Sequence, residues 1–142
     1  MAPRVLVGLQ FFAIGVLLLP LGAAGWVWTG FAVALAGLMG VAWTVGYNRW
    51  GNFNIRPEPR PGGALVTNGP YRWVRHPMYL GSLVIGAGAC IAGPEPWRIA
   101  AWPLLAAVLV AKARREERGL LGQFPGYAEY RRGRAFLIPG IW

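Results

Sequence analysis

The chain has 142 residues, of which 56% are hydrophobic and 13% charged, and its formal net charge is +9. With eight Trp and a mean hydropathy of +0.42, this composition excludes an ordinary soluble domain and indicates a membrane protein. One Cys and one His cannot form a disulfide or a zinc site built from several Cys and His ligands. We therefore expect neither a metal site nor a disulfide within this chain.

The first part of the chain is apolar, and no charged residue occurs from Val5 to Gly46. This run is long enough for two membrane crossings of about 20 residues each. We expect them at residues 5–22 and 26–47, because Pro and Gly interrupt the pattern between Pro20 and Gly25. A cleaved signal peptide is the alternative, since a basic residue, an apolar run and small residues resemble one. The second apolar run that follows directly favours two spans.

Two shorter spans are expected later in the chain, at residues 78–93 and 97–118. The uncharged part of the fourth span covers only Ile99 to Ala111. That helix therefore either crosses a locally thin bilayer or lets Arg98 and Lys112 extend to the two interfaces.

The distribution of basic residues predicts the orientation. In a four-span arrangement, thirteen of the fourteen Lys and Arg fall on one side, and Arg98 is the exception. Because basic residues near helix ends stay on the cytoplasmic side, we expect both termini in the cytoplasm and contacts with anionic lipid headgroups. Nucleic-acid binding is the rival interpretation of a sequence pI near 11.1, but no soluble basic module is present to carry it. The whole chain, residues 1–142, is expected to form a single domain.

Small residues recur at helical spacing in two of the predicted spans. They are Gly30, Ala34 and Gly37 in the second span and Ser82, Gly86, Ala89 and Gly93 in the third. Such stripes let helices approach closely in lipid, so we expect one compact bundle. The same faces would also allow a homo-oligomer to form.

Two polar segments fall on the same predicted membrane face. The first runs from Gly62 to Tyr79 and contains the single His of the chain. Pro77 after His76 suits the start of a helix, where unpaired backbone N–H groups favour an anion. The second begins at Lys112, which shares one helical face with Glu116 four residues later.

The adjacent acids Glu116 and Glu117 allow two interpretations. They either neutralise the neighbouring Arg side chains on a solvated helix or belong to a site. We favour a functional role for Glu116 and leave Glu117 open. Further along, Tyr127 and Tyr130 are expected to anchor the C-terminal segment against the bundle.

The motifs in this half of the chain occur in a distinctive order. They are Gly69-Pro70-Tyr71, Arg75-His76-Pro77-x-Tyr79-x-Gly81, Arg115-Glu116-Glu117, Phe124-Pro125-Gly126-Tyr127-Ala128-Glu129-Tyr130 and Ile138-Pro139. Over roughly residues 60–142, the chain resembles the isoprenylcysteine carboxyl methyltransferase family and its phospholipid methyltransferase relatives. These are integral membrane enzymes that use S-adenosylmethionine without a Rossmann fold, which agrees with the absence of a G-x-G-x-x-G fingerprint here.

The resemblance implies a cofactor site on the cytoplasmic side. Its residues are Gly63, Ala64, Leu65, Val66, Tyr71, His76, Pro77, Met78, Tyr79 and Glu116. It also implies acceptor-binding roles for Lys112 and Arg115. Lys112 falls where the isoprenylcysteine enzymes have an arginine implicated in holding the substrate carboxylate. Lysine supplies a point charge in place of a bidentate fork, which weakens the case for a carboxylate substrate.

The chemistry of S-adenosylmethionine suits these residues. The Glu116 carboxylate can pair with its cationic part, and the His76 ring and the loop N–H groups can receive its carboxylate. Methyl transfer needs mainly alignment of cofactor and acceptor. The expected fold is thus all-α, a polytopic membrane protein of about four transmembrane helices with a cytoplasmic cofactor-binding loop and a C-terminal helical extension.

The expected function is methylation of a lipophilic acceptor that reaches the cytoplasmic face from the bilayer, at a carboxylate, thiol or amine. One alternative is a catalytically inactive family member that acts as a membrane scaffold or regulator. A small transporter or channel subunit is the other, and the absence of ionisable residues within the first three spans disfavours it.

Overall fold

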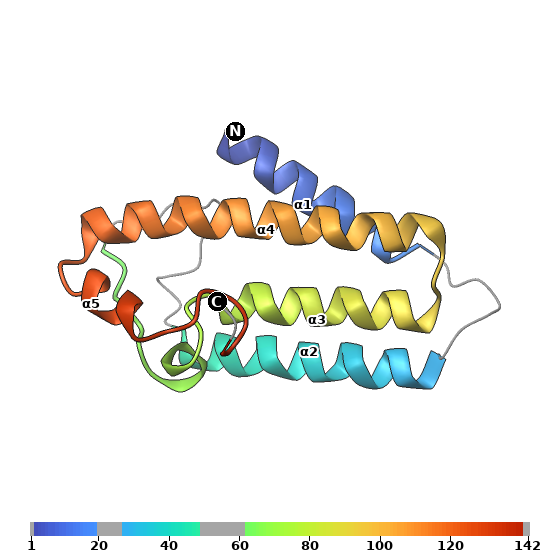
Figure 1. Cartoon of the computed structure of the whole chain (residues 1–142), viewed down its shortest axis with the longest axis horizontal. Helices are drawn as coiled ribbons and strands as arrows, with labels where there is room; N and C mark the ends of the chain where they lie inside the picture. Colours follow the sequence, from blue (N-terminus) through green and yellow to red (C-terminus); the bar gives the residue numbers. More distant parts are fainter. Residues whose placement is uncertain (1, 20–26, 49–61, 141–142) are drawn as a thin grey trace.

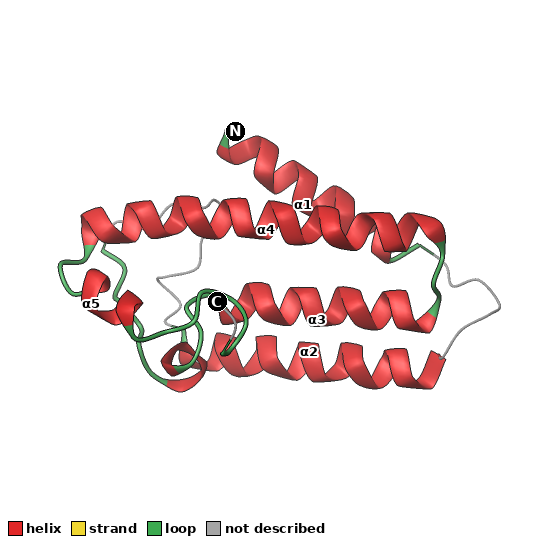
Figure 2. Ribbon diagram, in the orientation of Figure 1, coloured by secondary structure: helices red, strands yellow, loops and turns green. Residues whose placement is uncertain are grey.

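The computed structural model describes residues 2–19, 27–48 and 62–140, and this part of the chain is helical (Figure 2). The helices are α1 (Pro3–Leu17), α2 (Val27–Tyr47), the short 3-10 helix η2 (Gly69–Arg72), α3 (Pro77–Ala92), α4 (Pro96–Gln123) and α5 (Tyr127–Arg132). Within the described ranges, β-type pairing is limited to one isolated parallel bridge between Val74 and Ala135. The all-α expectation is therefore confirmed for these residues.

Helices α2, α3 and α4 lie side by side with alternating direction, and α1 crosses α4, with its N-terminus on the side away from α3 and its C-terminal end in contact with α3 (Figure 1). The principal helix contacts join α2 to α3, α1 to α4 and α3 to α4. Proline occupies the start of α1, α3 and α4, where its missing N–H costs no hydrogen bond. The second half of α4 extends beyond the first turn of α3, and α5 lies at that end of the bundle.

The observed helices differ from the expected spans mainly at two ends. Helix α1 stops at Leu17, five residues before the expected end of the first span, because the residue before Pro20 is disfavoured in a helix. The expected break at residues 20–25 lies outside the described residues. Helix α4 continues to Gln123, since the charged segment is helical as well, and it ends before Pro125.

Among the described residues, two helices are long and apolar enough to cross a membrane, namely α2 with 21 residues and α4 with 28 residues. Helices α1 and α3 are apolar but have only 15 and 16 residues. At 1.5 Å per residue they extend about 22 and 24 Å, against a hydrocarbon core of about 30 Å. Length and composition thus support two of the four expected spans.

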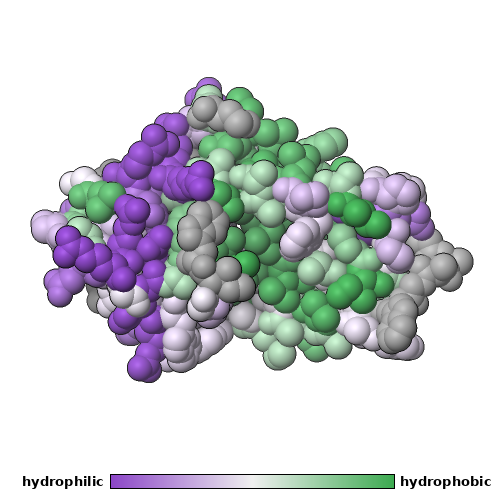
Figure 3. Space-filling view, viewed as in Figure 1, coloured by the Kyte–Doolittle hydropathy of each residue, from purple (hydrophilic) through white to green (hydrophobic). Residues whose placement is uncertain are grey.

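The bundle exposes apolar side chains over most of its length. On α2 the exposed ones include Trp28, Phe31, Leu35, Leu38, Met39 and Trp43. In Figure 3 the hydrophobic surface covers the middle of the molecule, and the hydrophilic surface gathers at the end that carries α5. A contiguous apolar surface of this kind is typical of a protein in contact with a membrane.

Close packing of α2 on α3 depends on glycines of both helices. A Cβ added at Gly37 would lie 2.8 Å from the backbone N of Ile85, and one at Gly88 would lie 2.6 Å from the backbone N of Ala34. The predicted stripe of the second span is confirmed, because Gly30, Ala34 and Gly37 face α3.

The small residues of the third span divide between two neighbouring helices. Gly81 and Gly88 face α2, whereas a Cβ at Gly86 would lie 2.9 Å from Cδ1 of Trp102 in α4. Helix α3 lies between two neighbours and has a row of small residues for each. The sequence shows both rows at helical spacing, and only the packing shows which row faces which helix.

Extension of Arg98 to a membrane interface was one of the two alternatives for the fourth span, but its side chain is fully buried. Its guanidinium donates to the carbonyl of Leu17 at 3.3 Å, to that of Gly93 at 2.9 Å, and to that of Leu19. Carbonyls at helix C-termini lack intrahelical donors and form the negative end of the helix dipole. The arginine therefore turns inward and joins the ends of α1 and α3 to the start of α4.

Candidate active site

His76 lies immediately before α3, at the end of the bundle that carries α5. The backbone N–H groups of Tyr79 and Leu80 donate to the His76 carbonyl, each at 3.1 Å. Its ring is buried, stacks on Tyr79 with a centroid distance of 5.5 Å, and contacts Phe136 edge-on at 5.2 Å. The proline-initiated helix and two aromatic neighbours thus hold the ring in one orientation.

Glu117 of α4 is the internal acid of the site. Its Oε1 lies 2.7 Å from Nε of Arg75 and 3.2 Å from Nε2 of His76, and its Oε2 lies 3.7 Å from Nε of Arg131. A carboxylate only accepts hydrogen bonds, so Nε2 of His76 carries the hydrogen in this contact. The sequence left Glu117 open, and its contacts join α4 to the residues around the start of α3 and to α5.

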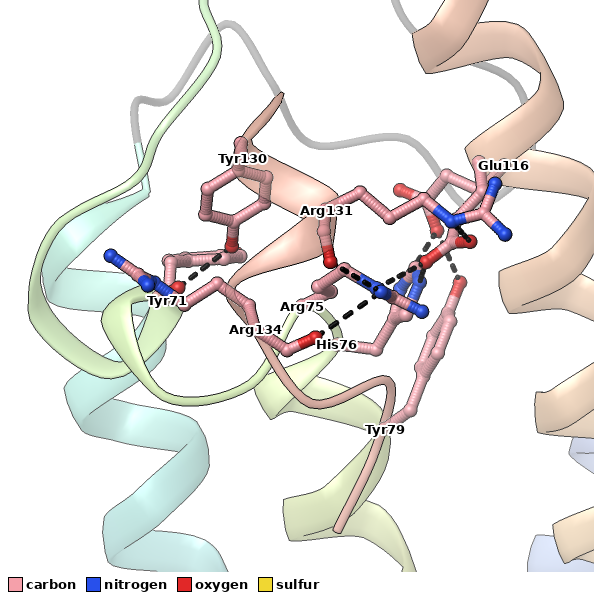
Figure 4. Close-up of polar contacts among 9 residues, drawn as sticks. Tyr71, Arg75, His76, Tyr79, Glu116, Tyr130, Arg131 and Arg134 are labelled. Carbon is pink, nitrogen blue, oxygen red and sulfur yellow. Dashed lines mark hydrogen bonds and ion pairs between the residues drawn. The ribbon is translucent and has the colours of Figure 1, made fainter. Parts of the chain in front are cut away.

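Glu116 is the accessible acid, with a side chain that is 34% exposed against 7% for Glu117. The hydroxyl of Tyr79 donates to its Oε2 at 3.1 Å, and Nδ1 of His76 lies 3.8 Å from the same atom. Figure 4 shows the Tyr79 side chain pointing toward Glu116. Two neighbouring carboxylates therefore differ in kind, because one is enclosed by cations and the other has an aromatic neighbour and access to solvent.

The C-terminal segment covers the buried part of the site. Nη1 of Arg75 donates to the carbonyls of Arg131 and Arg134 at 2.9 and 3.2 Å. The backbone N–H of Arg75 donates to the Ala135 carbonyl at 2.9 Å, and the Tyr130 hydroxyl donates to the Tyr71 carbonyl at 2.7 Å. Tyr130 is thus the anchor that the sequence predicted. Arg75 was part of a motif but was not predicted as a site residue, and no local pattern indicates that it binds a segment more than 50 residues away.

Burial changes the acidity of three phenols in this region. It raises the pKa of Tyr71 and of Tyr127 above the usual range, and the charges of Glu116 and Glu117, respectively, add to the effect. Burial also raises the pKa of Tyr130 to about 12, although Arg134 opposes that shift. All three hydroxyls stay protonated near neutral pH, so they can act only as hydrogen-bonding groups there and do not serve as bases.

Lys112 lies one turn before Glu116 and is almost completely buried. Its Nζ donates to Oε1 of Gln10 in α1 and lies 5.7 Å from the centroid of the Tyr79 ring. It therefore points inward between helices and does not extend to the interface. Arg115 is partly buried on α4, and its role in acceptor binding stays a prediction.

The remaining predicted cofactor residues occupy two places. Pro77 and Met78 form the first turn of α3 directly beside His76. Gly63, Ala64, Leu65 and Val66 form a partly buried segment before η2. The contacts of His76, Glu116 and Glu117 described above do not include these four residues, so their contribution stays a prediction. In the part of the chain that the structure describes, no group of three His, Cys, Asp or Glu side chains is placed to hold a metal ion.

An apolar helical bundle with acids, a histidine and a tyrosine gathered at its polar end defines a membrane-associated protein with a candidate ligand site. Comparison with known proteins adds the family. Residues 25–125 match the family model described as phospholipid methyltransferase, and because this match covers most of the chain, the protein belongs to that family. The family associates the chain with methyl transfer.

One curated relative is the cobalt-zinc-cadmium resistance protein CzcN of Cupriavidus metallidurans. It is 32% identical to this chain over 118 residues, which are 80% of this chain and 52% of the relative. The chain thus spans about half the length of the curated relative it matches. The helices α1 and α5 lie outside the residues matched by the family model.

Proposed function

We propose that the protein is an integral membrane methyltransferase that uses S-adenosylmethionine to methylate a lipophilic acceptor at a carboxylate, thiol or amine. One observation carries the proposal. The acid Glu116 follows the motif residues His76 and Tyr79 by 37 or more residues in the chain, but its Oε2 lies 3.1 Å from the Tyr79 hydroxyl and 3.8 Å from Nδ1 of His76. They do so inside the region that matches a methyltransferase family.

The membrane arrangement that we propose has four spans, formed by α1 to α4, with both termini in the cytoplasm. The alternating direction of α2, α3 and α4 supports it. Basic residues gather at the end where α2 finishes and α3 begins, and Arg98 lies at the other end. Among the residues that the structure describes, the exposed ones there are Arg72, Arg114, Arg118, Arg131, Arg132 and Arg134. Their side chains would contact anionic lipid headgroups on the cytoplasmic side.

The side chains present fit the cationic part of the cofactor. Glu116 has a partly exposed carboxylate, and Tyr79 both donates to it and presents an aromatic ring beside it. A carboxylate next to an aromatic ring suits an ammonium or sulfonium group. His76 lies beside this pair, with Nδ1 3.8 Å from Oε2 of Glu116, while its Nε2 is committed to Glu117.

When bound, S-adenosylmethionine supplies an electrophilic methyl group that needs no covalent enzyme intermediate. The protein's part is then alignment: Glu116 holds the cofactor, and Lys112 and Arg115 hold the head of the acceptor on the same stretch of α4. The buried phenols of Tyr71 and Tyr130 stay protonated, so an acceptor that must lose a proton would give it to Glu116 or His76.

Calorimetric titration of the detergent-purified protein with S-adenosylmethionine tests the proposal. We expect saturable binding that Glu116→Gln weakens more than tenfold, because it removes a charged partner of the ammonium. Glu129→Gln is the matched control, since Glu129 is exposed on α5. Equal affinity in the wild type and Glu116→Gln would remove Glu116 from the cofactor site. A folded wild type that binds no cofactor would contradict the proposal and favour a scaffold or regulator without turnover.

A further inference from the structure

A group of exposed aromatic side chains lies where the end of α2 meets η2. Trp43 and Tyr47 of α2 are each 45% exposed, and Trp73, directly after η2, is 53% exposed. The centroid of the Trp43 ring lies 6.2 Å from that of Tyr47 and 5.6 Å from that of Trp73. These three side chains and the neighbouring Arg72 form one surface, which we call the aromatic surface.

Arg72 supplies a cation to the aromatic surface. Its side chain is exposed, and its guanidinium carbon lies over the Trp73 ring, 5.4 Å from the centroid. A cation–π contact of this kind restrains the side chain while the planar guanidinium keeps N–H donors that match a phosphate. A group suited to phosphate is therefore held directly beside the exposed rings.

The backbone around Trp73 is fixed on its neighbours. Gly69, the first residue of η2, has a φ of +57°, and a Cβ added there would lie 2.8 Å from Cδ2 of the Tyr47 ring. Only glycine fits this approach without strain, so η2 packs directly on the end of α2. The Trp73 carbonyl accepts from the backbone N–H of Ala135 at 3.2 Å. The aromatic surface thus has a defined shape.

The aromatic surface lies at the boundary between the apolar and the polar parts of the molecule. On α2 it continues the exposed apolar side chains that include Leu35, Leu38 and Met39. It lies toward the end that carries α5, where the hydrophilic surface gathers (Figure 3). Trp and Tyr prefer this level of a membrane, because their rings are apolar and their N–H or O–H groups are polar. A lipid at the membrane interface is therefore the partner that this position fits.

The charge of the lipid headgroup follows from the cations on the surface. Because Arg72 already lies over the Trp73 ring, a second cation such as choline is disfavoured there. A headgroup with a net negative charge is attracted by Arg72 and by the other exposed arginines at this end of the bundle.

We propose that the aromatic surface binds one anionic phospholipid, with its phosphate on Arg72 and its glycerol and upper acyl chains on the rings of Trp43, Tyr47 and Trp73. This inference goes beyond the proposed function. It takes from that proposal only that this end of the bundle meets a leaflet of the membrane.

Native mass spectrometry of the detergent-purified protein tests the inference, because it resolves each bound lipid. The probes are dioleoylphosphatidylglycerol and dioleoylphosphatidylcholine, which have the same acyl chains and differ in headgroup charge. They are titrated separately, without S-adenosylmethionine. We expect the first phosphatidylglycerol to bind about fivefold more tightly than the first phosphatidylcholine, which is the effect of about one basic residue near an anionic lipid.

The charge is tested with Arg72→Gln, which should weaken phosphatidylglycerol binding about fivefold and leave phosphatidylcholine binding nearly unchanged. Arg118→Gln is the matched control. It removes the same charge from an exposed position on α4, which α3 separates from α2, and it should keep the wild-type preference.

The rings are tested with Trp73→Leu, which should weaken the binding of both lipids severalfold because the guanidinium and the glycerol region lose an aromatic face. Trp73→Phe keeps such a face and should retain most of the affinity. Trp28→Leu removes an exposed Trp at the opposite end of α2 and should leave the first binding step unchanged. These positions are exposed, so each variant should keep the melting temperature of the wild type in detergent.

Equal affinity for phosphatidylglycerol in the wild type and Arg72→Gln would overturn this inference, and so would equal affinity of the wild type for the two lipids. An effect of Arg118→Gln or Trp28→Leu as large as that of its matched variant would overturn it too, because binding would then follow overall charge or apolar area. These outcomes leave the proposed methyl transfer intact. Failure to bind S-adenosylmethionine in the calorimetric titration would contradict the proposed function alone.

Discussion

Each end of the bundle has an arginine that binds backbone carbonyls, fully buried Arg98 at one end and partly buried Arg75 at the other, and their further partners differ. At one end Arg98 donates to carbonyls at the ends of α1 and α3. These hydrogen-bond partners are backbone carbonyls without a formal charge. At the other end Arg75 binds the carboxylate of Glu117 and two carbonyls of the C-terminal segment. The first arrangement only provides hydrogen-bond donors to carbonyls at helix ends. The second one places charged groups beside an accessible acid, which is what a ligand site requires.

The largest effect is expected for Arg98→Met, which keeps much of the side-chain volume but removes every donor. Three carbonyls then lose a charged partner, and hydrogen bonds to charged groups contribute about 1.5–3 kcal/mol each, so the free energy of unfolding should fall by about 4 kcal/mol or more. Thermal unfolding in detergent measures it. Arg132→Met, at an exposed position, is the control and should change little. A mild effect of Arg98→Met would contradict a structural role for this end.

Glu117→Gln tests the other end. It removes the charge that Arg75, His76 and Arg131 share, and breaking a buried ion pair costs about 3–5 kcal/mol when one partner is lost entirely. Because the amide retains one acceptor, we expect a loss of about 2–3 kcal/mol together with faster proteolysis of the C-terminal segment. Arg98→Met should leave that segment protected. Equal protection in Glu117→Gln and the wild type would mean that Glu117 does not hold the segment.

Between the two ends, Gly88→Ala tests the close contact of α2 and α3. The added Cβ would lie 2.6 Å from the Gly30 carbonyl oxygen, a backbone atom that cannot move independently. Overpacking of this kind costs about 1–3 kcal/mol. Gly40→Ala is the control in α2, because nothing lies within 4 Å of its added Cβ. Similar melting temperatures for the two variants would show that the helices are less closely packed than described.

The smallest effect is expected for Tyr130→Phe, which removes one hydrogen bond to the Tyr71 carbonyl and should cost about 1 kcal/mol. The effect should depend on pH. Folding raises the pKa of this phenol from 10.0 to about 12, so its contribution is complete below pH 10 and is lost as the pH rises toward 12. Denaturant unfolding of both proteins between pH 8 and pH 12 would measure this. A stability difference that stays constant over that range would exclude the titration of Tyr130 as its cause.

Much of the fold was predictable because it depends on local patterns. Apolar runs separated by Pro, Gly and charged residues predicted helices close to α2, α3 and α4, and His76 before Pro77 predicted the start of α3. The shared face of Lys112 and Glu116 follows from the helical repeat alone. The predicted end of the first span was too late in the chain. The two apolar residues before Pro20 resemble the rest of the span, although they follow the last turn of α1.

The composition and spacing of this chain determined its class, its helices and the motifs of its candidate site, because these depend on interactions between residues near in sequence. Only the tertiary structure decided which of two adjacent acids is enclosed, that Arg98 and Lys112 point inward, and that Gln10 accepts a hydrogen bond from Lys112. The residues that form these contacts are 41, 81 and 102 positions apart. No local pattern encodes such pairs, since they form only when packing brings the helices together and burial makes an unpaired charge costly.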